Sequence, residues 1–407
     1  MLVAAAALPV RVFAQEGGRL VVAADSEPKN LNPAIVASNG VFFVASKVVE
    51  PLAEASFEGK DGLAPRLATS WEGSDDGLSV TFKLREGVTW HDGKPFTSAD
   101  VAFSALNVWK PLQNLGRLVF ANLEEVDTPD EHTAVFKFSR PTPFQLIRNA
   151  LPAVTAVVAK HVYEGSADIA ADPANAKLTG TGPFKFAEHK AGEYYLLTKN
   201  DAYWGEGQPK LSEIVYRVLP DRAAAAGALE ADEIQLAAFS QVPLADLDRI
   251  AEVEGIKIYS TGYEGLTYQL AVEINHRRKE LADLKVRQAI AHAIDRDFVV
   301  KTIFLGYAKP STGIVPRNAP EFYNPDVPTY AFDVEKANAL LDEAHETVDV
   351  AARTELFIKF QKLVAEDLPL INGAEWGFIT VARDSVKNVS NNPRWAVSNW
   401  ADTELES

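Results

Sequence analysis

The chain contains no cysteine among its 407 residues. This absence excludes disulfide bonds, a thiol nucleophile, zinc bound through cysteine and a lipid attached to an N-terminal cysteine. The sequence is also poor in basic residues, because 40 lysines and arginines stand against 56 aspartates and glutamates, for a formal net charge of −16. Nucleic acid is therefore not an expected partner, since phosphate binding needs a basic surface.

Recognisable catalytic motifs are missing as well. The sequence has neither Gly-x-Ser-x-Gly nor His-Glu-x-x-His, which mark common serine hydrolases and zinc proteases. Its seven histidines are scattered and never stand at the paired spacing of a metal site. From Gly87 to Lys94 the chain resembles a phosphate-binding loop, but the glycine spacing is wrong and a proline follows the lysine. We therefore expect a binding protein without catalytic residues, cofactor or metal, with a hydrolase as the alternative.

The sequence begins with a short apolar run, Met1–Ala14, that ends in Val-Phe-Ala. This pattern predicts the residual end of a secretory signal peptide cleaved before Gln15. The alternative is an N-terminus that is disordered or buried in the core. No other run approaches the roughly 20 apolar residues of a membrane span. We therefore expect export to a periplasm, without a lipid anchor or direct membrane insertion.

Length and periodicity predict an α/β protein with two lobes. The chain exceeds the size of one usual domain and is 47% apolar, so at least two substantial cores are expected. Apolar strands such as Ile214–Leu219 alternate with helical patterns such as Ala223–Glu230, which predicts a mainly parallel sheet covered by helices. Thr97 or Ser98 is expected to cap a helix that begins at about Ala99.

The stretch Gly265–Asn275 is predicted to be a strand, because its aromatic and β-branched residues partly alternate. Glu273 lies inside it, between Val272 and Ile274. A buried unpaired charge is costly, so this acid is expected to have a partner. That partner is either an internal salt bridge or the cation of a ligand, such as an amino terminus. One helix or two consecutive helices are predicted over Ala282–Phe304.

Several segments resemble one protein family. The segment VRQAIAHAIDRDFVVKTIFLGYAKPSTGIVP (Val286–Pro316) resembles the signature of the peptide/nickel family of extracellular solute-binding proteins, which supply ABC importers. The segments EPKNLNP, from Glu27, and GTGPF, from Gly180, are similar to further parts of that family. The resemblance covers nearly all of Leu20–Trp400. It implies a fold like that of the type II periplasmic binding proteins, in which two lobes joined by a hinge close over a solute.

The resemblance also implies a division of the chain. Lobe 1 is expected to consist of a main domain and an accessory domain, and lobe 2 is expected to be one shortened unit. The expected boundaries are residues 15–45, 160–262 and 376–407 for the main domain, 46–159 for the accessory domain and 263–375 for lobe 2.

Lobe 2 is expected to be truncated near residues 345–350. In the family, the helix predicted here over Ala331–Ala344 leads into more of lobe 2, whereas here a second predicted helix, Ala351–Glu366, follows at once. The missing piece carries the family's acid and aromatic residues for a peptide amino terminus, and in some members an arginine for the carboxylate, so none of these can be transferred. A natural shortening and a deletion both remain open. Exposed apolar patches or self-association are the expected consequence.

The resemblance, together with loop positions, assigns a set of residues to ligand binding. Trp376 is expected either to stack on a ligand or to pack within the protein, and the glycines after Gly180 are expected to bring the backbone close to a neighbour such as the ligand. The first cleft loop has the alternative of being a surface loop without a role. The assigned residues are Glu27, Asn39, Gly40, Thr181, Gly182, Tyr268, Glu273, Asn372, Glu375 and Trp376.

The expected function is therefore that of a periplasmic substrate-binding component of an ABC importer. Its expected partners are a small-molecule or peptide ligand and the membrane permease subunits of the importer. Relatives in the family bind dipeptides, oligopeptides, glutathione, opines, nickel chelates or sugars, so the resemblance does not specify the ligand. The alternative is a shortened paralogue that no longer binds solute and acts as a scaffold or chaperone-like surface.

Overall fold

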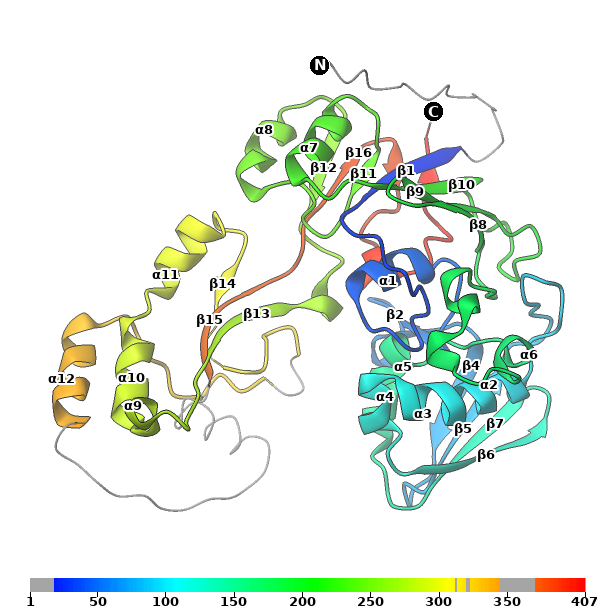
Figure 1. Ribbon diagram of the computed structural model, residues 1–407, viewed down its shortest axis with the longest axis horizontal. Coiled ribbons are helices and arrows are strands. Elements are labelled where there is room, and N and C mark those ends of the chain that lie inside the picture. Colours follow the sequence, from blue (N-terminus) through cyan, green and yellow to red (C-terminus); the bar gives the residue numbers. More distant parts are fainter. Residues whose placement is uncertain (1–17, 312, 320–322, 345–369, 407) are drawn as a thin grey trace.

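The computed structural model describes residues 18–311, 313–319, 323–344 and 370–406. Lobe 1 contains the elements up to β12 together with β16–β18, and lobe 2 contains β13–β15 and α9–α12 (Figure 1). Two neighbouring strands, β13 and β15, join the lobes (Figure 1). The predicted signal peptide, the predicted second helix at 351–366 and the expected gap at 345–350 lie outside the described residues.

A mixed seven-stranded sheet forms the centre of lobe 1, in the order β12-β16-β11-β1-β10-β9-β8. β1 runs parallel to β10 and β11, whereas the other neighbouring pairs are antiparallel. The prediction of a mainly parallel sheet was therefore wrong, because a short turn connects β8 to β9 and a loop without a helix connects β9 to β10. The strands are β1 Arg19–Ala24, β8 Phe184–Lys190, β9 Tyr194–Lys199, β10 Glu213–Val218, β11 Leu236–Ala237, β12 Ile256–Tyr259 and β16 Thr380–Arg383.

Helices cover both faces of this sheet, as the apolar sequence of β1 requires. Leu20 and Val22 belong to the large core that includes α1 (Asn39–Ala45), whereas Ala23 faces a second core. That second core is completed by residues of α7 and α8. These two helices span Arg222–Glu230 and Leu247–Ala251.

The accessory domain is built on a four-stranded antiparallel sheet in the order β4-β5-β7-β6. Its helix α2 begins with the predicted cap, since Thr97 and Asp100 form a capping box. The strands are β4 Ala68–Gly73, β5 Ser79–Leu84, β6 Leu123–Asp130 and β7 Thr133–Phe138, and the helices are α2 Ser98–Phe103, α3 Lys110–Leu112, α4 Asn114–Val119, α5 Phe144–Val154 and α6 Lys160–Tyr163. Two small sheets complete lobe 1: β2 Ala53–Ala55 with β3 Leu63–Pro65, and β17 Val386–Lys387 with β18 Glu404–Leu405.

Lobe 2 is built on the three-stranded sheet β13-β15-β14. The helical stretch predicted over 282–304 is interrupted at Ile294 and Asp295, whose backbones are extended; the Asp295 side chain then caps α11 by accepting a hydrogen bond from Phe298 N at 2.8 Å. Within the described residues, no helix is both long and apolar enough to cross a bilayer. The elements are β13 Tyr268–Glu273, β14 Lys309–Pro310, β15 Leu370–Trp376, α9 Lys279–Ala282, α10 Leu284–Ala293, α11 Arg296–Phe298 and α12 Val334–Ala344.

Candidate functional site

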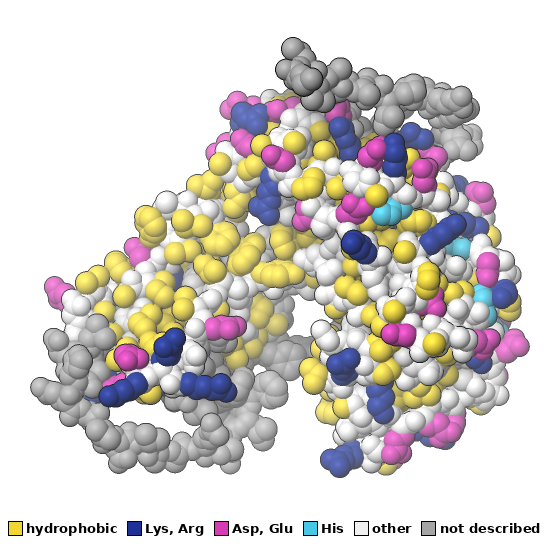
Figure 2. Space-filling view, in the orientation of Figure 1, with side chains coloured by type: hydrophobic (Ala, Val, Ile, Leu, Met, Phe, Trp, Pro, Cys, Tyr) yellow, Lys and Arg dark blue, Asp and Glu magenta, His cyan; other side chains and the backbone are white. Residues whose placement is uncertain are grey.

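The two lobes meet where β13 and β15 cross between them. Tyr268 opens β13 and lies opposite Trp376, the last residue of β15. The Tyr268 ring also lies 5.0 Å from the Phe378 ring, which in turn lies 5.1 Å from the ring of Phe239 in the lobe 1 core. Aromatic contacts therefore connect the core of lobe 1 to the first residues of lobe 2. Figure 2 shows that the surface is hollowed between the lobes below this crossing.

Two of the predicted site residues meet at this crossing. Asn39 is the first residue of α1, which Ser38 caps by accepting from Val41 N at 3.3 Å. The Asn39 Nδ2 donates a hydrogen bond of 2.8 Å to the hydroxyl of Tyr268. Because these residues belong to different lobes, the bond joins them at the edge of the hollow.

The first predicted loop packs against the start of α1. A Cβ atom at Gly40 would lie 2.6 Å from Ser26 Oγ, so a larger residue there would require the Ser26 side chain to turn away. The neighbouring Glu27 accepts hydrogen bonds from Gly192 N at 3.0 Å and from His189 Nε2 at 2.6 Å. These bonds, the one from Gly192 first, lower the pKa of Glu27. The Glu27 carboxylate is thus occupied by the β8–β9 turn.

Thr181 and Gly182 lie inside lobe 1. Thr181 is 1% exposed and donates a hydrogen bond of 3.0 Å to Glu50. A Cβ atom at Gly182 would lie 2.5 Å from the Lys47 carbonyl oxygen and 2.8 Å from that of Val48. The close neighbours are therefore the Glu50 side chain for Thr181 and the backbone of lobe 1 for Gly182, and not a ligand, which corrects their assignment to the binding site.

The position of Glu273 contradicts the prediction that this acid is buried near the ligand. It ends β13, five residues beyond Tyr268, and a strand that rises about 3.4 Å per residue puts it about 17 Å from the crossing. Its side chain is exposed. The argument that a buried acid needs a partner was wrong here, because β13 is an edge strand of a small sheet and this end of it is open to solvent.

Asn372 and Glu375 are buried in lobe 2. The backbone carbonyl of Asn372 accepts a hydrogen bond of 2.7 Å from Arg296 Nε. The carboxylate of Glu375 forms an ion pair with Arg317. Both residues thus have partners within lobe 2. An internal salt bridge of the kind considered for Glu273 does exist, but it is made by Glu375.

Trp376 packs within the crossing. It is half-buried, and its ring centre lies 5.0 Å from that of Phe304 and 6.0 Å from that of Tyr268. These contacts agree with the packing alternative for this residue, and stacking on a ligand stays a prediction. One side of the aromatic cluster remains accessible, since Tyr268 is 40% exposed.

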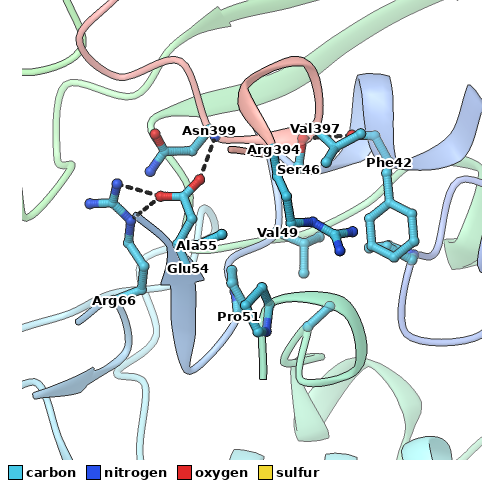
Figure 3. Close-up of a pocket in the computed structure, with 13 residues that line it drawn as sticks. Phe42, Ser46, Val49, Pro51, Glu54, Ala55, Arg66, Arg394, Val397 and Asn399 are labelled. Atoms are coloured by element: carbon cyan, nitrogen blue, oxygen red, sulfur yellow. Dashed lines mark hydrogen bonds and ion pairs between the residues drawn. The ribbon is translucent and has the colours of Figure 1, made fainter. Parts of the chain in front are cut away.

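A cavity of about 30 Å³ lies in lobe 1, on the edge formed by α1 and β2 that faces lobe 2 (Figures 1 and 3). The Arg394 side chain extends into it, beside Phe42, Val49 and Pro51 (Figure 3). Burial lowers the pKa of Arg394 to about 10, against smaller raising effects of Tyr268 and Glu54. Arg394 is therefore a cation at neutral pH.

The sequence offered no signal for this arginine. Arg394 is a single basic residue in a loop, and its surroundings come from α1, β2 and the segment after residue 393, which are far apart in the chain. Within the described part of the chain, no three metal-ligating side chains gather. The described side chains offer hydrogen bonding by Asn39 and aromatic contact with Tyr268 at the crossing, and the charge of Arg394 in the lobe 1 cavity.

Comparison with known proteins gives consistent results. The sequence profile of "Bacterial extracellular solute-binding proteins, family 5 Middle" matches residues 62–363. A Brucella ovis protein named for peptide binding in ABC transport is 34% identical over 331 residues, which cover 77% of this chain and 58% of that protein. The dipeptide-binding protein of Escherichia coli K12 is 30% identical over 349 residues, which cover 80% of this chain and 63% of that protein. The chain thus spans about three fifths of these relatives' length.

A solved structure supports the fold. The oligopeptide-binding protein AppA of Bacillus subtilis, in complex with a nonapeptide, superimposes with a TM-score of 0.79 at 21% identity, over 97% of this chain and 100% of that chain. The fold is therefore that of the two-lobed α/β binding proteins that the sequence predicted.

Proposed function

Since the chain belongs to the bacterial extracellular solute-binding proteins of family 5, we propose that it is the solute-capturing component of an ABC importer. The observation that supports this most is the crossing, where the lobes are joined by β13 and β15 and by the 2.8 Å hydrogen bond from Asn39 to Tyr268. Because only a few contacts connect the lobes at this point, a hinge motion can close them over a solute.

The proposed ligand is a peptide or a similar small solute. Support comes from the relatives, which are named for peptides and dipeptides, and from the nonapeptide bound by AppA. Backbone hydrogen bonds and bridging waters would hold such a ligand with tolerance for varied side chains. The proposed contacts are Asn39 and Gly40 from lobe 1 and Tyr268 with Trp376 from the crossing. No observation favours the scaffold alternative, because the relatives are named as binding proteins.

The proposed setting is the periplasm, reached through the signal sequence expected over Met1–Ala14. There the loaded protein would deliver its solute to membrane permease subunits.

The test is capture of solute by the purified protein. Native mass spectrometry on protein purified without refolding is expected to detect a bound small molecule, and a peptide library is expected to raise the melting temperature. A ligand at 100 times its Kd adds about 2.7 kcal/mol to the free energy of unfolding. The double variant Asn39→Ala/Tyr268→Ala is expected to lose most of this gain, whereas Leu118→Ala, at a side chain 73% exposed in the accessory domain, is expected to keep it. Absence of both captured solute and stabilisation would overturn the proposal.

A further inference from the structure

The first cleft loop, residues 25–33, is fastened to a hairpin that lies far along the chain. The Glu27 carboxylate accepts a hydrogen bond of 2.6 Å from His189 Nε2 and one of 3.0 Å from Gly192 N. His189 belongs to β8, and Gly192 lies in the turn between β8 and β9. One carboxylate therefore takes two donors from the same hairpin, which fixes its direction as well as its distance.

The hairpin is a rigid support for this loop. Tyr195 of β9 is 1% exposed and lies opposite His189 in the strand pairing. The rings of His189 and Tyr195 are stacked, with centres 4.2 Å apart and planes 6° from parallel. The Tyr195 hydroxyl also donates a hydrogen bond of 3.0 Å to the carbonyl oxygen of Pro28. The loop is thus held at two successive residues, Glu27 by its side chain and Pro28 by its backbone.

The fastened loop touches the start of α1. Ser26, directly before Glu27, has its Oγ 2.6 Å from the place where a Cβ atom of Gly40 would lie, so the loop and the helix are in close contact. Gly40 follows Asn39, whose Nδ2 donates to the Tyr268 hydroxyl. A shift of the loop would therefore reach the lobe 1 residues that the proposed function assigns to solute contact.

Stability is not the main effect expected of this carboxylate. The side chains of Glu27 and His189 are 29% and 32% exposed, and exposed ion pairs contribute little to the free energy of unfolding. Placement is a separate effect, because binding residues next to a loop depend on the scaffold that holds the loop.

We propose that Glu27 is a positioning residue for solute capture, which holds the first cleft loop against the β8–β9 hairpin and so keeps Asn39 and Gly40 where a solute meets them. His189 is its partner in this role. Glu27 acts on the site without touching the solute, unlike the direct contact that the family resemblance implied for it. This inference rests on the proposed function and adds a residue to the machinery of the same site.

The chain offers a matched control for this carboxylate. Asp92 also accepts from a histidine and from a backbone amide, at 2.8 Å from His161 Nε2 and 3.3 Å from Lys94 N. The side chains of Asp92 and His161 are 39% and 21% exposed, similar to those of Glu27 and His189. Both donors to Asp92 lie in the accessory domain, in the turn before α2 and in α6. Asp92→Ala therefore removes equivalent bonds at a place where no effect on capture is expected.

The first test needs no solute. Hydrogen exchange followed by mass spectrometry is expected to show the backbone amides of the first cleft loop and of the first turn of α1 exchanging about fivefold faster in Glu27→Ala than in the unaltered protein, the factor that corresponds to one ordinary hydrogen bond. Asp92→Ala is expected to leave these amides unchanged. Unchanged exchange in Glu27→Ala would overturn the proposal, whether or not a solute has been found.

The second test measures capture. Calorimetric titration with a library of di- and tripeptides is expected to show Glu27→Ala binding about fivefold more weakly than the unaltered protein, and Asp92→Ala binding as the unaltered protein does. The melting temperatures of the two variants are expected to be equal. Glu27→Gln keeps an acceptor oxygen and is expected to restore part of the affinity. Equal loss of affinity in the two alanine variants would overturn the positioning role, whereas failure of every peptide with the unaltered protein would count against the proposed function.

A further variant separates positioning from direct contact. His189→Ala leaves the Glu27 carboxylate in place and removes one of its donors, so it is expected to weaken the binding of the same peptides. A loss of affinity in Glu27→Ala that is absent in His189→Ala would assign the carboxylate to the solute itself and would overturn the proposal.

Discussion

The interiors of the two lobes differ in kind. The large core of lobe 1 is continuous from the main sheet into the accessory domain and includes fully buried rings such as Trp109, Phe82 and Trp395. In the described part of lobe 2, the corresponding cluster of buried residues consists of Ala291 and Ile371, with four partly buried residues around them. The apolar contact that stabilises a fold is therefore concentrated in lobe 1.

Lobe 2 compensates with polar contacts and leaves apolar side chains exposed. Arg296 donates from Nε to the carbonyl of Asn372 at 2.7 Å and from Nη1 to that of Tyr330 at 2.8 Å, so that one side chain connects α11, β15 and the segment before α12. Among the described residues, eight of the thirteen large hydrophobic residues that are exposed lie between residues 268 and 334, and Figure 2 shows apolar surface on this lobe. These exposed side chains agree with the expected apolar surface, whereas the shortening of lobe 2 and self-association stay predictions.

The difference in buried core predicts which lobe is stable and which lobe is mobile. A region with few buried contacts opens at lower free energy than one with a large core. Lobe 2 is therefore expected to be the part that moves and adapts, and lobe 1 the rigid platform that carries Asn39 and Arg394. Three substitution experiments test whether the two lobes differ in stability and mobility.

The largest expected effect comes from a matched pair of leucine truncations. Leu20, in β1 of lobe 1, is fully buried, whereas Leu270, in β13 of lobe 2, is 42% exposed. Removing a buried leucine side chain costs about 2–5 kcal/mol, through lost transfer free energy and the cavity left behind. Leu20→Ala is therefore expected to lower the free energy of unfolding by that amount in urea titrations, and Leu270→Ala by less than about 1 kcal/mol. Equal losses in the two variants would show that the lobes are stabilised alike.

The next largest effect concerns the loss of stability of lobe 1 at acidic pH. His91 joins the accessory domain to the main domain, because its Nδ1 accepts from Gly180 N at 3.3 Å while its Nε2 bonds to the Gly182 carbonyl at 2.9 Å. Burial lowers the pKa of His91 from 6.5 to about 4. The unfolded chain thus binds the proton first as pH falls. Stability from this group is complete above pH 6.5 and declines toward pH 4, by roughly 3 kcal/mol at most.

The variant His91→Gln separates this contribution from that of the carboxylates. Thermal unfolding measured between pH 7 and 4 is expected to depend less steeply on pH in His91→Gln than in the unaltered protein. The matched control His276→Gln removes an exposed histidine from lobe 2 and is expected to leave the profile unchanged. If His91→Gln has the profile of the unaltered protein, the buried histidine does not hold lobe 1 together in the neutral form.

Sequence reasoning succeeded where the signal is local. The cap formed by Thr97 and Asp100 follows from residue types three positions apart. The cap could therefore be read without knowing which elements surround it. Asn39 and Tyr268 were both expected to bind the ligand, but the hydrogen bond between them was not predicted.

The other site residues could not be predicted, because their environment is set by residues that are distant in the sequence. The glycine pattern at Gly182 indicated a close contact but not that the contact is the backbone of Val48. Glu273 was expected to be buried because its strand neighbours are apolar, yet an edge strand in a small lobe leaves it in solvent. Arg394 gave no signal at all, since its apolar surroundings are assembled from three distant segments.

The smallest expected effect tests the bond between the lobes. Tyr268→Phe removes the hydroxyl that accepts from Asn39 Nδ2, in a residue that is 40% exposed. Such a bond contributes about 0.5–1.5 kcal/mol, and less where water can replace it, so the melting temperature is expected to change little. A shift of 1 kcal/mol nevertheless changes the ratio of two lobe arrangements about fivefold. The effect should therefore appear in the distance between the lobes and not in stability.

The absence of cysteine makes this distance measurable. Spin labels on cysteines introduced at Leu118 in lobe 1 and Phe298 in lobe 2, both exposed, report the separation of the lobes by pulsed electron paramagnetic resonance. Tyr268→Phe is expected to broaden the distance distribution, while the control Tyr330→Phe, at a ring that packs on the lobe 2 cluster of Ala291 and Ile371, is expected to leave it as it was. A broader distribution would show that a rigid lobe 1 holds a mobile lobe 2 through this bond. An unchanged distribution would instead locate the restraint in the paired backbones of β13 and β15.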